Sequence, residues 1–125
     1  MWIKDGSIKF SDRGNVGSCI MPDNPDWHLG ITKRVECIDF SKWLEKTVKK
    51  EDYVIIKMDI EGAEFDVIEK MILDQTIKLV DELHVEFHEQ RFRDKYNFYK
   101  SRKDKIMRSL IRFKKNGQLI LRKES

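Results

Sequence analysis

The sequence predicts an α/β protein in which helices flank a small sheet. An apolar, β-branched run at Val54–Met58 leads directly into an acidic turn and then into a helical pattern. Two further strand-like runs, near 83–88 and 118–122, alternate with helical segments, as in chains that build parallel sheets. With 125 residues and a 40% hydrophobic share, the chain can bury the core of one domain, residues 1–125.

The first third of the chain predicts three short strands and a helix. The strands fall near 7–10, 17–21 and 34–38. Residues 12–18 form a polar, glycine-containing segment between the first two strands, and this composition favours a hairpin loop. We therefore expect antiparallel as well as parallel pairing, that is, a mixed sheet. A helix is predicted near 40–49.

The central segment predicts a strand at 53–59, a tight turn and a helix at 62–73. The strand is a continuous apolar stretch, which is typical of a parallel strand covered on both faces. Gly62 permits the tight turn. The helix then has one apolar face, formed by Phe65, Ile68, Met71 and Ile72.

The last segment predicts a basic helix at 94–115 that ends at Asn116-Gly117 and precedes a strand at 118–122. Residues 1–90 have a net charge of −7 and residues 91–125 have a net charge of +10. An apolar stripe on the helix contains Tyr96, Tyr99, Ile106, Leu110 and Phe113. We expect this stripe to dock on the acidic half and leave the basic residues solvated. Attraction of an anionic substrate is the weaker alternative, and nucleic-acid binding is not expected.

The octapeptide Lys57-Met-Asp-Ile-Glu-Gly-Ala-Glu64 resembles the signature of the FkbM-type methyltransferases, which depend on S-adenosylmethionine. The segments 35–44 and 84–88 resemble the regions of that family on either side of the signature. The resemblance implies the Rossmann-like class I methyltransferase fold. It also implies methyl transfer from S-adenosylmethionine to an oxygen of a small molecule or sugar.

The chain departs from that family because it has no Gly-x-Gly turn between a strand and a helix. It therefore resembles only the C-terminal half of such a domain, without the N-terminal cofactor-binding strands, and we identify no cofactor-binding residues. This departure predicts an incomplete or split methyltransferase. The alternative is a non-catalytic remnant, that is, a binding or assembly module whose basic helix meets an acidic partner.

Polar residues at the ends of two predicted strands are the candidate site. Asp59 and His88 are the candidate catalytic bases, and Glu61 and Glu86 would position hydroxyl groups of the acceptor. Glu64 has an equally good structural explanation, since acidic residues are favoured in the first turn of a helix. The same four site residues could ligate a metal ion, but no ligand spacing within one element requires it. The sequence therefore predicts a metal-free site.

Other features bound the location and the partners of the chain. No apolar run approaches the roughly 18–20 residues that cross a bilayer, and the first residues lack the apolar stretch of a signal peptide. Cys19 and Cys37 are expected to be thiols in a reducing compartment, so the expected location is cytoplasmic. An unpaired apolar edge on strand 53–59 predicts a homodimer or a complementing N-terminal half.

Overall fold

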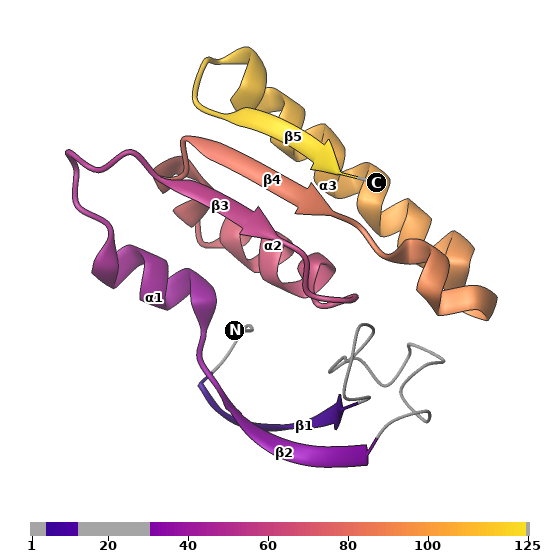
Figure 1. Cartoon of the computed structure of the whole chain (residues 1–125). Helices are drawn as coiled ribbons and strands as arrows, with labels where there is room; N and C mark the ends of the chain where they lie inside the picture. The colour runs from indigo at the N-terminus through magenta and orange to yellow at the C-terminus, as the bar shows by residue number, and fades with distance from the viewer. Residues whose placement is uncertain (1–4, 13–30, 125) are drawn as a thin grey trace.

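The computed structural model describes residues 5–12 and 31–124, and it shows a small α/β fold (Figure 1). The strands are β1 (Gly6–Asp12), β2 (Ile31–Cys37), β3 (Ile55–Met58), β4 (Glu82–Glu86) and β5 (Ile120–Glu124). The α-helices are α1 (Phe40–Thr47), α2 (Glu64–Leu73) and α3 (Tyr96–Lys115). Two 3-10 helices, η2 (Thr76–Leu79) and η3 (Glu89–Lys95), precede β4 and α3.

The strands form two separate sheets. β3, β4 and β5 are parallel and lie in that order, with α2 and α3 as the crossovers that parallel strands require. β1 and β2 form an antiparallel pair that lies apart from the parallel sheet (Figure 1). The prediction of one mixed sheet was therefore wrong for the described strands. The strand predicted at 17–21, with most of its hairpin loop, lies outside the described residues.

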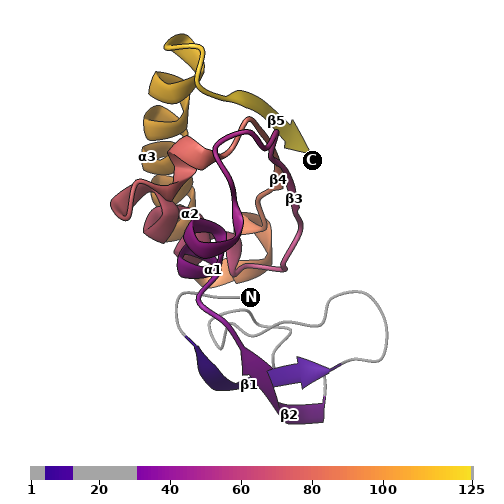
Figure 2. The same ribbon diagram turned by 90° about the vertical axis from the view of Figure 1, so that its left-hand side faces the viewer.

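The helices cover only one face of the parallel sheet (Figure 2). Leu83 and Val85 point to that face and are completely buried. On the other face, Ile55 is 59% exposed and Lys57 is also exposed. The expectation that strand 53–59 would be covered on both faces was wrong for this structure. An apolar run shows that a strand avoids water, but it does not show which element covers each face.

An aromatic cluster joins α2 to α3. Phe65 is completely buried and its ring contacts those of Phe87, Phe92 and Tyr99. Tyr99, Ile106 and Leu110 bury the apolar face of α3 in the same core, so the predicted docking of the basic helix is confirmed for these residues. Tyr96 of the predicted stripe is exposed, and Arg102 and Lys103 are paired with carboxylates instead of being solvated.

Arg102 holds the same two helices together by charge. Its guanidinium pairs with Asp66 and Glu69 on α2, and it lies 5.3 Å from the centre of the Tyr99 ring. Burial alone would lower the pKa of Arg102, but the two carboxylates raise it above its usual value. In the described part of the chain, no helix is both long and apolar enough to cross a membrane.

Candidate functional site

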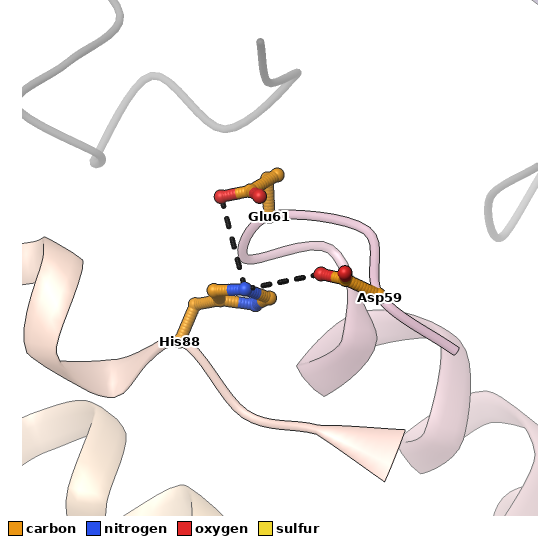
Figure 3. Close-up of side chains that lie close together, drawn as sticks. All are labelled: Asp59, Glu61 and His88. Atoms are coloured by element: carbon orange, nitrogen blue, oxygen red, sulfur yellow. Dashed lines mark ion pairs between the residues drawn. The ribbon is translucent and has the colours of Figure 1, made fainter. Parts of the chain in front are cut away.

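The parallel sheet brings the predicted site residues together at one edge. β3 and β4 are neighbouring parallel strands, so their carboxyl ends lie side by side. Asp59 and Glu61 follow β3, whereas Glu86 ends β4 and His88 follows it. The carboxyl ends of the strands are the usual place for ligands in open α/β sheets. Figure 3 shows Asp59 and Glu61 on either side of the His88 ring, each joined to it by an ion pair.

The imidazole of His88 lies at the centre of this group. Its Nε2 atom is 3.2 Å from Asp59 Oδ1, 3.7 Å from Glu61 Oε2 and 3.8 Å from Glu86 Oε1. The His88 side chain is only 7% exposed, whereas that of Asp59 is 48% exposed. Asp59 is therefore the group that an incoming molecule can reach, and His88 lies behind it.

Glu64 fixes the orientation of His88. Its carboxylate is completely buried, and Oε1 accepts a hydrogen bond from the His88 backbone N–H at 2.7 Å. The same oxygen lies 3.1 Å from His88 Nδ1, and Oε2 accepts from the Gly62 N–H at 2.8 Å. A carboxylate can only accept hydrogen bonds, so Nδ1 carries a proton and Nε2 faces the site. A functional role for Glu64 could not be predicted from its position, because the helix dipole also favours an acidic residue there.

The turn between β3 and α2 adopts an unusual backbone conformation that places Glu61. Glu61 has a φ of 55° and Gly62 has a φ of 108°. The left-handed region is unfavourable for a residue with a Cβ atom, by about 1–2 kcal/mol. Glu61 is held there beside Arg91, whose Nε lies 2.9 Å from Glu61 Oε2. Arg91 was not predicted as a site residue, since it lies in a 3-10 helix that the sequence pattern does not reveal.

The surrounding carboxylates change the acidity of His88. Burial alone would lower the pKa of His88 because it disfavours the charged ring. The hydrogen bond that His88 donates to Glu64, together with the charges of Glu64, Glu61 and Asp59, outweighs burial and raises the pKa of His88 above its usual value. The site thus favours a positive charge at its centre.

These groups define the chemistry that the site can perform. Carboxylate oxygens can accept hydrogen bonds from hydroxyl groups, take a proton from one of them, or bind a cation. The same charges repel anions, so a phosphate or carboxylate group is a poor ligand here.

A separate apolar cavity lies beside the outer edge of β3. It has a volume of about 350 Å³ and lies between that strand and α1. Trp43, Leu44 and Ile55 are among the side chains that line it. β3 pairs only with β4 among the described strands, so the cavity borders an unpaired strand edge.

The fold and the site define an α/β protein with a carboxylate–histidine site at the carboxyl edge of a parallel sheet. The chain belongs to the DUF7870 family, a domain of unknown function, whose match covers residues 22–110. Comparisons with curated proteins and with solved structures found no match.

The predicted membership of the FkbM-type methyltransferases was wrong. The octapeptide at 57–64 lies inside the DUF7870 match, and no FkbM-type match was found. The octapeptide encodes a strand end, an acidic turn and a helix start. These local requirements can be met in more than one family, so they did not identify the family of this chain.

Proposed function

We propose that the acidic edge of the sheet binds a neutral hydroxyl-bearing molecule and activates its oxygen for methylation. The reaction would be S-adenosylmethionine-dependent O-methylation of a small molecule or sugar. The position of Asp59 carries this proposal: a half-exposed carboxylate lies at the carboxyl end of a parallel strand, 3.2 Å from the buried His88 ring. Proton removal by such a group contributes typically about 10²–10⁴-fold to a rate.

Each side chain has a distinct part in the proposed site. Asp59 takes the proton of the acceptor hydroxyl. His88 lies behind Asp59 and holds its orientation, while Glu64 holds His88. Glu86, which is 34% exposed, can accept a hydrogen bond from a second hydroxyl of the acceptor. A polyhydroxylated acceptor such as a sugar would use both carboxylates.

The described residues do not fit the methyl donor. Of the turns that follow β2, β3 and β4, only the one after β3 contains a glycine, Gly62, and its N–H is already bonded to Glu64. The cavity beside β3 is lined almost entirely by apolar side chains, which offer few partners for a charged nucleotide-like cofactor. We therefore propose that other residues bind S-adenosylmethionine. The three parallel strands would then be part of a larger Rossmann-like sheet.

Methyl transfer tests the proposal directly. Labelled S-adenosylmethionine is incubated with a panel of neutral sugars and small polyols. The enzyme is the chain alone, or the chain co-expressed with the product of an upstream reading frame that encodes a strand followed by Asp-x-Gly-x-Gly. We expect label in a hydroxylated acceptor only with the second preparation, and only with Asp59 intact. If neither preparation transfers label, the alternative of a non-catalytic binding or assembly module is favoured.

A further inference from the structure

We propose that Asp59, Glu61 and His88 form a binding site for a divalent metal ion. One ligand atom from each residue lies within 4.8 Å of the others. Ligands of one ion, at bond lengths of about 2.0–2.2 Å, lie about 3–4.4 Å apart. Small side-chain movements would therefore bring the three atoms into a common coordination sphere. The spacing within the sequence did not predict this site, because its ligands come from two strand ends.

The orientation of His88 is a second and independent observation that favours an ion. The His88 side chain is only 7% exposed, and Glu64 Oε1 accepts a hydrogen bond from Nδ1 of its ring. On the other side of the ring, Nε2 faces Asp59 Oδ1 at 3.2 Å and Glu61 Oε2 at 3.7 Å. The buried ring thus presents one nitrogen to two carboxylates, which is a donor set that can hold a cation. Metal-binding histidines are commonly held by a carboxylate on their other nitrogen in this way.

Glu61 gives a third reason to expect an ion. Its Oε2 atom is buried and forms no hydrogen bond in the described part of the structure. Arg91 Nε lies 2.9 Å away as an ion pair, but the direction of the contact does not satisfy hydrogen-bond geometry. The left-handed backbone of Glu61 keeps this carboxylate beside His88 instead of letting it turn to solvent. A bound ion would give Oε2 a directed bond in addition to its ion pair with Arg91.

The ligand set indicates the class of ion. Two carboxylates and one imidazole suit ions that accept both oxygen and nitrogen, such as Mn²⁺ and Zn²⁺, better than Ca²⁺, which prefers oxygen. Glu86 lies 3.8 Å from His88 Nε2 and can hold a water molecule of the ion or serve as a fourth ligand. Where the proposed function holds, the ion would also bind the acceptor oxygen. Asp59 has two oxygens, so it can ligate with one and accept the proton with the other.

The test uses the metal-depleted chain of 125 residues and Mn²⁺ as the probe. Calorimetry measures the affinity, and pulsed electron paramagnetic resonance detects a nitrogen ligand on the ion. We expect binding at one site with a nitrogen coupling, a loss of affinity of at least about tenfold in Asp59→Asn, and loss of the coupling in His88→Gln. Glu51→Gln removes an exposed carboxylate from a loop and is the matched control, which should bind as the parent does.

Two results would overturn the proposal. The first is no binding of Mn²⁺ or Zn²⁺ at about millimolar concentration by folded protein. The second is equal affinity in Asp59→Asn, Glu61→Gln and Glu51→Gln, which would indicate nonspecific attraction to acidic residues. Circular dichroism controls for folding. If His88→Gln does not fold, the affinity of Asp59→Asn, at a half-exposed position, still tests the proposal.

The metal site and the proposed function can fail separately. Metal binding is measured without donor or acceptor, so it does not depend on methyl transfer. If the chain binds Mn²⁺ at this site but supports no methyl transfer, the metal site is supported and the proposed function is contradicted. If methyl transfer continues unchanged in the presence of a chelator, the proposed function is supported and the ion has no part in the reaction.

Discussion

The carboxylates of this protein meet positive charge in two contrasting places. At the interface of α2 and α3, Asp66 and Glu69 share the guanidinium of Arg102, which also lies over the rings of Phe65 and Tyr99. At the edge of the sheet, Asp59, Glu61, Glu64 and Glu86 surround the single imidazole of His88. At the helix interface, the positive group is permanent and packing holds it in position.

The difference separates a structural ion pair from a site. Arg102 is always charged and offers several donors in a fixed plane, so two carboxylates are satisfied by the protein itself. His88 is charged only when protonated, and its ring has two nitrogens for four carboxylates. The edge of the sheet therefore has acceptor atoms available for a hydroxyl group or an ion. Variants can test whether these two roles are as distinct as the geometry indicates.

The largest effect is expected for Asp59→Asn. The change keeps the shape of the side chain and removes its negative charge and basic oxygen, so the turnover of the complemented protein should fall about 10²–10⁴-fold. If Asp59 only shapes the turn, the cost is about 1–2 kcal/mol of stability and turnover falls only with the folded fraction. Single-turnover rate and melting temperature are measured on the same preparation. Normal turnover in stable protein would move the catalytic assignment to His88.

Arg102→Leu should lower stability and leave turnover unchanged, the opposite of what is expected for Asp59→Asn. It leaves Asp66 and Glu69 without their shared cation at a half-buried interface, so the free energy of unfolding should fall by about 1–3 kcal/mol. Turnover and Mn²⁺ affinity per folded molecule should not change. Urea denaturation measures the loss, and Arg108→Leu, at an exposed position on the same helix, is the control. Equal losses in both variants would show that the ion pair adds nothing.

Because α3 packs within its own chain, we expect association to use the edge of β3 that pairs with no other described strand. Ile55 is 59% exposed there, and Ile55→Lys should weaken self-association by about tenfold, since a charge on an edge strand opposes pairing. Light scattering over a range of concentrations measures this. Leu73→Lys, at an 81% exposed position on α2, is the control. A parent chain that stays monomeric at high concentration, with the amides of β3 protected from exchange, would contradict the expectation.

The smallest expected signal is the binding of S-adenosylmethionine to the chain alone. A site without backbone donors for the cofactor cannot offset the cost of ordering it, so calorimetry should detect weak binding or none. Metal-loaded and metal-depleted protein should behave alike in this measurement. A dissociation constant in the low micromolar range would show that the described residues hold the donor after all.

The sequence predicted local structure better than it predicted contacts. The strands β3, β4 and β5 and the three α-helices occur near their expected positions, because apolar periodicity and Gly62 determine them locally. The positions of Asp59 and His88 at neighbouring strand ends could be predicted because both follow apolar strands. Their convergence depends on the parallel register of β3 and β4, which the order of elements already favours.

Other parts of the site could not be predicted because they depend on tertiary structure. The contact between Glu64 and His88 joins residues 24 positions apart, and the first turn of a helix gave Glu64 a sufficient local explanation. Arg91 lies in η3, whose backbone changes direction at Arg93, where φ is 40°. The exposed face of β3 was not predicted, because the sequence of an apolar strand does not indicate which elements cover its faces.

The carboxylate of Glu64 also makes the site a reporter of folding. Its bonds to Gly62 and His88 can form together only when β4 has taken its place beside β3, so the segment from 59 to 88 should open and close as one cooperative unit. The amides of Gly62 and His88 should then exchange with solvent at the same rate. A ligand that binds at this edge would slow both equally, because it stabilises only the closed form.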